Sequence, residues 1–301
     1  MQDRVGSLVG GKYRLLRRLG SGGMGEVYEA RHEGTGGAVA VKVMRRELAG
    51  RSAAETRFDR EARVAGRIGH DGICEVLDVG RTEDGLPYLV MPCLRGRSLA
   101  DLLAREGRLP VRRAVDIAEQ VLAALEAAHA AGILHRDLKP ANVFLTRMGE
   151  RDDFVKLLDF GVAGLLGDQG ADNRPTRDGG LVGTAHYMSP EQVRGRLALD
   201  RRADLYAVGV LFYEMLTGRT PFQGRSDTEV LSAILLDAFP PPRALRPEIP
   251  ARLEAEILRA LSRDREARHA DAGSLRRALR GVLDGADAGV AAASQAAGVP
   301  E

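Results

Sequence analysis

The sequence predicts an α+β protein, with strands in the first third of the chain and helices in the rest. Residues 26–31 alternate with strand period and residues 38–44 form a mostly apolar run, with a glycine-rich turn between them. From residue 98 onward helical periodicity dominates. One long amphipathic helix, ending at Gly132, repeats apolar residues at i, i+4, i+8 and i+11: Ile117, Val121, Leu125 and Ala128.

The expected sheet is small and antiparallel. Its strands are predicted at residues 13–19, 26–31, 38–44, 73–80 and 87–91. A helix is expected at 54–67, between the third and fourth strands. Residues 204–213 are apolar nearly all round, which is typical of a helix buried at the centre of a domain.

Composition and charge exclude several classes of protein. The net charge of +2 gives no reason to expect binding to nucleic acid or to an anionic membrane. Cys74 and Cys93 are far apart and fit neither a disulfide framework nor a zinc site, so we expect a reduced cytoplasmic compartment. Residues 1–12 lack the apolar core of a signal peptide, and no apolar run approaches the roughly 18 residues of a membrane span.

Two short strings bring carboxylates, an ammonium group and a carboxamide together. Residues 135–142 read His-Arg-Asp-Leu-Lys-Pro-Ala-Asn, directly after the long helix, and residues 159–161 read Asp-Phe-Gly. They match the patterns H-R-D-L-x-x-x-N and D-F-G. Either string alone is weak evidence of function, but their order and spacing together indicate one site with acid-base groups and metal ligands.

A glycine-rich string lies upstream of Lys42. Residues 20–25 read Gly-Ser-Gly-Gly-Met-Gly, and the glycines allow backbone amides to approach phosphate oxygens. Dinucleotide-binding folds use the same pattern to open a helix. Here a strand follows, which favours a loop between antiparallel strands. Lys42 interrupts an apolar strand, so its ammonium needs an anion unless it faces water from an edge strand.

These strings, together with Ser189-Pro190-Glu191, resemble the motifs of serine/threonine protein kinases. The amino-acid sequence of residues 133–145 and 183–192 is most similar to the bacterial eukaryotic-type members. The resemblance implies a two-lobed fold, with a sheet-rich N-lobe and a larger helical C-lobe. It covers about residues 13–283, and the implied ranges are: N-terminal extension 1–12, kinase domain 13–283 (N-lobe 13–91, hinge 92–94, C-lobe 95–283) and flexible tail or linker 284–301.

The resemblance also assigns the catalytic groups. Asp137 would accept the proton of the substrate hydroxyl, and Lys139 would stabilise charge on the transferring phosphoryl group. Asn142 and Asp159 would supply oxygen ligands to Mg2+, with Mn2+ as an alternative ion.

Lys42 would hold the α and β phosphates of ATP and pair with a glutamate of the 54–67 helix. That partner is expected to be Glu61, with Glu55 and Asp59 as alternatives. If Lys42 pairs with Glu61, both belong to the catalytic set.

ATP would lie along the glycine loop and the hinge. The carbonyl of Pro92 and the N–H of Leu94 would hold adenine, and Met91 would limit access to a back pocket. Val27, Ala40 and Phe144 would form apolar walls around the purine. The alternative for each is an ordinary residue of the hydrophobic core. The full nucleotide set is Gly20, Ser21, Gly22, Gly23, Met24, Gly25, Val27, Ala40, Lys42, Met91, Pro92, Leu94, Phe144 and Asp159.

The segment after Gly161 matches an activation loop. Thr176 is the one hydroxyl side chain between residues 164 and 183. Because Arg136 would suit a phosphate brought in by this loop, we expect Thr176 to be phosphorylated in trans by another copy, through a transient homodimer. The alternative is that Thr176 is never modified.

Further expectations concern packing. His135 should pack against Phe160, and Asp204 should cap the backbone of the catalytic loop. Glu191 should pair with Arg268. His129, on the long helix, is expected to be packed or partly exposed rather than functional.

The predicted function is therefore transfer of the γ-phosphoryl group of Mg-ATP to serine or threonine hydroxyls of protein substrates. Two rivals remain: a pseudokinase scaffold and a small-molecule phosphotransferase on a similar fold. The expected location is the cytoplasm, or the cytoplasmic side of a membrane-anchored kinase if the chain is part of a longer protein.

Overall fold

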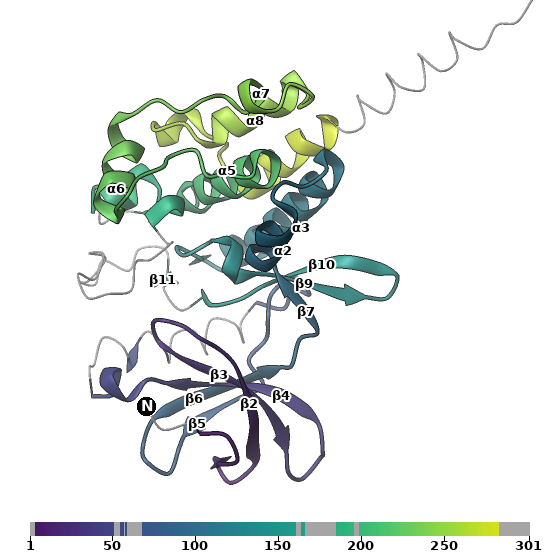
Figure 1. The fold of residues 1–301 in the computed structure, drawn as a ribbon, viewed down its shortest axis with the longest axis vertical. Helices are drawn as coiled ribbons and strands as arrows, with labels where there is room; N and C mark the ends of the chain where they lie inside the picture. The colour runs from purple at the N-terminus through teal and green to yellow at the C-terminus, as the bar shows by residue number, and fades with distance from the viewer. Residues whose placement is uncertain are drawn as a thin grey trace, which may run out of the picture.

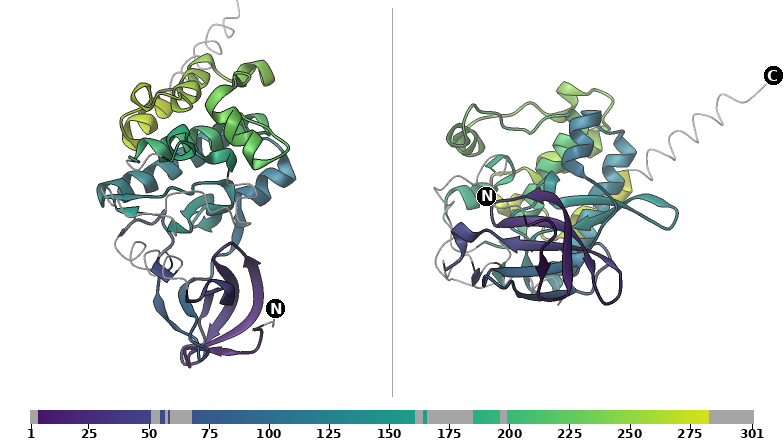
Figure 2. Two further views of the ribbon diagram at one scale, coloured as in Figure 1. Left: turned by 90° about the vertical axis from the view of Figure 1, so that its left-hand side faces the viewer. Right: turned by 60° about the horizontal axis from the view of Figure 1, so that its bottom comes forward.

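The computed structural model describes residues 4–50, 55–56, 58, 68–160, 185–195 and 199–282, and the backbone of 164–165. Within these ranges the apolar core divides into a large cluster in the helical part and two smaller clusters in the sheet-rich part. Figures 1 and 2 show the sheet and the helices as two lobes joined by the chain near β6 and β7. The two-lobed α+β fold is thereby confirmed.

The N-lobe is a six-stranded sheet in which every neighbouring pair is antiparallel, in the order β1-β2-β3-β4-β6-β5. Its strands are β1 (Leu8–Val9), β2 (Tyr13–Ser21), β3 (Gly25–His32), β4 (Ala38–Met44), β5 (Asp78–Arg81) and β6 (Pro87–Pro92). The strands predicted at 13–19, 26–31, 38–44 and 87–91 are all present. Most of the helix expected at 54–67 lies outside the described residues.

The sheet differs from the prediction at two places. β1 was not expected, and it pairs with β2 through Leu8 and Val9. The strand predicted at 73–80 is wrong for its first half, because β5 begins only at Asp78. The N–H of Cys74 donates instead to the carbonyl of Leu157 (2.9 Å), and the N–H of Leu157 donates to Gly72 (2.7 Å). This stretch therefore pairs with a strand of the C-lobe.

The C-lobe is built on two long helices, α3 (Val111–Ala130) and α5 (Arg202–Thr217), which pack against each other. The helix predicted from Ile117 to Ala128 is α3, and Gly132 follows it with φ of 75°, a conformation that glycine adopts without strain. α5 is buried along nearly its whole length, which confirms the central helix predicted at 204–213. Other α-helices of the C-lobe are α2 (Leu99–Glu106), α4 (Pro190–Val193), α6 (Asp227–Leu236), α7 (Pro242–Leu245) and α8 (Ala251–Ala260), and residues 272–282 are also helical.

Short strands line the side of the C-lobe that faces the sheet of the N-lobe (Figure 1). β9 (Val143–Met148) pairs with β10 (Arg151–Leu157) and with β7 (Gly96–Ser98), while β8 (Ile133–Leu134) pairs with β11 (Gly164–Leu165). The segment between β8 and β9 is the 135–142 string. The strands thus fix both ends of that string at the junction of the lobes.

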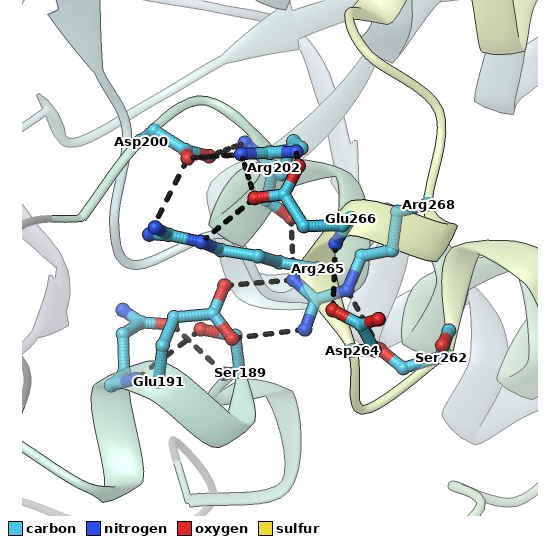
Figure 3. A network of polar contacts seen from close by, with 10 residues as sticks. Ser189, Glu191, Asp200, Arg202, Ser262, Asp264, Arg265, Glu266 and Arg268 are labelled. Carbon is cyan, nitrogen blue, oxygen red and sulfur yellow. Dashed lines mark hydrogen bonds and ion pairs between the residues drawn. The ribbon is translucent and has the colours of Figure 1, made fainter.

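A buried ion pair joins two segments of the C-lobe. Arg268 donates two hydrogen bonds to the carboxylate of Glu191, at 2.7 and 2.9 Å, and both residues are almost fully buried. Arg268 also donates to the carbonyls of Ser262 and Arg202, so its guanidinium is well satisfied. Figure 3 shows the pair beside a more exposed network of Asp200, Arg202, Arg265 and Glu266. The predicted pairing is confirmed.

We predict that Glu191→Ala lowers the free energy of unfolding by about 3 to 5 kcal/mol, because it leaves the guanidinium of Arg268 buried without its counter-charge. Urea denaturation followed by circular dichroism measures this loss. Glu266→Ala, which removes an exposed partner in the neighbouring network, is the matched control and should change the midpoint far less. Equal effects of the two substitutions would contradict the prediction.

Candidate active site

The 135–142 string forms a loop that ends in a short 3-10 helix, Pro140–Asn142. Lys139 Nζ lies 3.0 and 3.2 Å from the carboxylate oxygens of Asp137. Asn142 Nδ2 donates to the carbonyl of Asp137 (2.8 Å) and contacts its carboxylate at 3.3 Å. These bonds hold the carboxylate of Asp137 in one place while leaving it partly exposed.

The backbone of this loop is fixed by a buried carboxylate on α5. Asp204 accepts hydrogen bonds from the N–H groups of His135 and Arg136, both at 2.9 Å. His129, on α3, lies with Nε2 2.8 Å from the same carboxylate. Burial alone would raise the pKa of Asp204, but the hydrogen bond from His129 and the other contacts outweigh it and lower the pKa. The expectation that Asp204 caps the loop is confirmed.

His135 is fully buried and packs its ring against Phe160, with centroids 4.6 Å apart, as predicted. Its Nε2 lies 3.1 Å from the carbonyl of Leu158. Burial lowers the pKa of His135, against the opposing effect of the Asp204 and Asp137 carboxylates, so the ring stays neutral.

An ion pair between Lys42 and Asp159 connects the two lobes. Lys42 Nζ lies 2.6 Å from Asp159 Oδ1, and Lys42 is only 6% exposed. β4 has a strand on each side, with Lys42 paired to Val27 and Leu89, so the edge-strand alternative is wrong. A buried ammonium needs such an anion, since desolvation otherwise favours the neutral amine.

The predicted partner of Lys42, Glu61, lies outside the described residues, as does the alternative Asp59. The other alternative, Glu55, contacts Arg81 at 3.2 Å and accepts from the N–H of Gly50.

The glycine-rich string forms the turn between β2 and β3. Gly20 and Ser21 still belong to β2, opposite Val27 and Glu26, and the N–H of Gly22 donates to the carbonyl of Gly25 (2.8 Å). The loop therefore joins two antiparallel strands, and the dinucleotide-fold alternative is wrong. A Cβ on Gly25 would lie 2.5 Å from the carbonyl oxygen of Val43, whereas one on Gly23 would meet nothing within 4 Å. Met24 occupies the tip between these glycines.

The residues expected around adenine come from four strands, β3, β4, β6 and β9, and from the segment after β6. Ala40 on β4 pairs with Met91 on β6, and Val27 on β3 pairs with Lys42 of β4. Pro92 ends β6 and Leu94 follows it. Phe144 lies on β9, in the C-lobe. A small cavity next to Asp159 includes Met91 in its lining, with Cys74, Glu75, Val76, Leu89, Leu158 and Phe160.

Two further residues help to hold the loop and were not expected to do so. His129 was expected to be packed or partly exposed, yet it contacts Asp204, which binds the loop backbone. Gln192 donates from Nε2 to the carbonyl of Arg136 (2.9 Å). The S-x-x-Q pattern of Ser189 to Gln192 signals a helix cap, but its reach to Arg136 depends on tertiary structure.

The donor set suits Mg-ATP. Asn142 turns its Nδ2 towards Asp137, which leaves its oxygen on the other side, and Asp159 offers a carboxylate. The N–H of Leu158 donates to the carbonyl of Asn142 (2.9 Å), which places Asp159 next to the loop. Two oxygen ligands are few for a protein-only cage, and within the described ranges no three His, Cys, Asp or Glu side chains could hold a metal ion. Mg2+ commonly completes its shell with phosphates and water.

The sequence of residues 13–267 matches the protein kinase domain family. The chain belongs to this family. It is 41% identical over 282 residues to the serine/threonine-protein kinase pkn3 of Myxococcus xanthus, covering 93% of this chain and 51% of that protein. It is 40% identical over 285 residues to the serine/threonine-protein kinase PknH of Mycobacterium tuberculosis, covering 95% of this chain and 44% of that protein.

Solved structures agree with these sequence matches. The kinase domain of Mycobacterium tuberculosis PknI is 31% identical and superposes with a TM-score of 0.70, covering 93% of this chain and 99% of that domain. The chain therefore carries a kinase domain of the bacterial serine/threonine class. It spans about half the length of the curated relatives named above. Among the described helices, none combines the length and the apolar character needed to cross a bilayer.

We predict that Gly25→Ala raises the KM for ATP at least severalfold, because the added methyl group would collide with the carbonyl of Val43 and push the glycine loop away. Gly23→Ala is the matched control, since space is open there. Steady-state kinetics at varied ATP measures both. Equal KM values for the two variants would contradict the assignment of this contact.

A second prediction concerns pH. The folded protein keeps His135 neutral, whereas in the unfolded chain it binds a proton near its ordinary pKa of about 6.5. The free energy of unfolding should therefore be fully retained above about pH 6.5 and should fall as the pH drops below it. The pKa of His269, which burial also lowers, adds an effect of the same sign. His135→Phe should flatten this decline in urea titrations at several pH values, and an unchanged slope would contradict the prediction.

Proposed function

We propose that this chain transfers the γ-phosphoryl group of Mg-ATP to serine or threonine hydroxyls of proteins. The observation that carries the proposal is that one group of residues from each lobe meets at the same place. Asp137 is held by Lys139 and Asn142 on the C-lobe loop, and Lys42 of the N-lobe reaches Asp159 beside that loop. This grouping of a carboxylate base, two ammonium groups and two oxygen donors supports a role in phosphoryl transfer.

Each group has a distinct task in this proposal. Asp137 orients the substrate hydroxyl and accepts its proton as the oxygen attacks the γ-phosphorus and the bond to ADP breaks. Lys139 places positive charge beside that carboxylate and offsets charge on the transferred group. Lys42 holds phosphate oxygens, and Asn142 and Asp159 are the residues that would hold Mg2+, which when bound neutralises phosphate charge.

Lys42 would bind phosphate in addition to its contact with Asp159. Its Nζ contacts Asp159 directly, and in the nucleotide complex it would serve the α and β phosphates while pairing with Glu61. An ammonium has three donors and can therefore serve several anions at once.

Regulation through Thr176 is part of the proposal. Thr176 lies outside the described residues, and its phosphorylation by a second copy is inferred from the composition of residues 164–183 and from Arg136 next to the base. The partners would then be protein substrates and, transiently, a second copy of this chain.

The domain limits also stand as a proposal. The kinase domain would run from 13 to 283 with a hinge at 92–94, and residues 284–301 would be a tail or linker. ATP as substrate and the two free cysteines, Cys74 and Cys93, suit a cytoplasmic setting.

Intact-mass analysis with phosphosite mapping tests this function. Wild-type protein incubated with Mg-ATP should gain phosphates on serine or threonine, including Thr176, whereas Asp159→Asn should gain none. Asp137→Asn should lower kcat by about 10² to 10⁴ with little change in ATP affinity, since it removes the proton acceptor alone. Unmodified wild-type protein that still binds ATP would instead indicate a pseudokinase. Phosphorylation of small molecules but not of proteins would favour the other rival.

A further inference from the structure

The two peptide groups that flank Arg136 are hydrogen-bonded to side chains from two different helices, α5 and α4. Its N–H donates to Asp204 Oδ1 on α5 (2.9 Å), and its carbonyl accepts from Gln192 Nε2 on α4 (2.9 Å). Between them Arg136 has φ of 63°, a left-handed conformation that non-glycine residues adopt at a cost of about 1 to 3 kcal/mol unless their surroundings impose it. The next residue is Asp137.

The carboxamide of Gln192 is itself fixed in orientation. Its Oε1 accepts from the backbone N–H of Ser189 (2.9 Å), and the backbone N–H of Gln192 donates to Ser189 Oγ, which completes a capping box at the start of α4. With the oxygen engaged in this cap, the nitrogen end is directed at the carbonyl of Arg136. Glu191, the preceding residue, is anchored by Arg268, which also ties down the start of α4 next to Gln192.

We propose that Gln192 is a positioning residue for the transfer reaction. By donating to the carbonyl of Arg136, it keeps the Arg136–Asp137 peptide in the orientation that aims the Asp137 carboxylate at the substrate hydroxyl. The inference rests on the proposed function and deepens it, because it joins the Ser189-Pro190-Glu191 helix to the base. A loss of alignment of about 1 Å at a reacting group can cost on the order of 100-fold in rate.

A merely structural role would be limited to capping α4, and the two roles use different atoms of one side chain. In Gln192→Glu, a carboxylate oxygen can still accept from Ser189, because glutamate serves a capping box as well as glutamine does. The other carboxylate oxygen would lie opposite the carbonyl oxygen of Arg136. Neither oxygen carries a proton, so no hydrogen bond can form between them. This substitution therefore keeps the cap and removes the donor.

The test compares kcat and the KM for ATP on a peptide substrate in wild type, Gln192→Glu and Ser189→Ala. We expect Gln192→Glu to lower kcat about 10- to 100-fold while the KM for ATP stays within about twofold. Ser189→Ala, which weakens the cap but leaves the donor in place, should lower the melting temperature and change kcat little. A kcat of Gln192→Glu equal to that of wild type at neutral pH would overturn the proposal.

A pH profile adds a readout that a cap alone would not change. When the introduced carboxyl group is protonated it can donate to the carbonyl of Arg136, so kcat of Gln192→Glu divided by wild-type kcat should rise as the pH falls from about 8 to about 5.5. The division removes the pH dependence that is common to both proteins. A ratio that is low and independent of pH would overturn the proposal.

If Gln192→Glu does not fold, Gln192→Met decides the question. It has similar length but neither donor nor titratable group, so it should lose kcat to a similar extent at every pH. Unchanged kcat in Gln192→Met would overturn the proposal. Because activity of the wild type is established first by intact mass, failure of the proposed function appears there, and failure of this inference appears only in the variants.

Discussion

The arrangement of the active site depends on one buried carboxylate. Asp204 is almost fully buried, and a charge in that position is costly unless several donors satisfy it. His129 on α3 and the backbone N–H groups of His135 and Arg136 supply them. Since all three must be in place together, the packing of α3 against α5 and the course of the catalytic loop are set by the same interaction. The packing of the C-lobe core and the position of Asp137 are thus linked through Asp204.

The two halves of the site differ in how they are held. Asp137, Lys139 and Asn142 are fixed within the C-lobe by short-range contacts that need no nucleotide. Lys42 arrives from a different lobe with its own apolar core, and among the described residues it meets the C-lobe through Asp159. The backbone pairing of residues 72–74 with Leu157 is a second tie between the same regions. In the proposed reaction the proton acceptor would therefore be preorganised, whereas phosphate binding would depend on how the lobes lie relative to each other.

The sequence was sufficient for features that follow from local pattern or from motif. The alternating pattern of the strands and the apolar residues all round α5 were enough to predict these elements. The motif strings identified Lys42, Asp137 and Asp159 as candidate site residues. It was insufficient where tertiary hydrogen bonds decide. Residues 73–77 have strand composition, but the N–H of Cys74 bonds to Leu157 of the other lobe, and β5 begins only at Asp78. Gln192 reads as a cap, and His129 reads as core, until the fold places them beside Arg136 and Asp204.

The short strand β1 bears on where this domain can be cut. Leu8 and Val9 pair along β2, and Arg4 forms an ion pair with Asp84 at 2.7 Å, so the segment before Tyr13 covers one margin of the sheet. The family match begins only at Tyr13. A protein shortened to that residue would present the unpaired N–H and C=O groups of β2 to solvent, the kind of open strand along which separate molecules join sheets and aggregate.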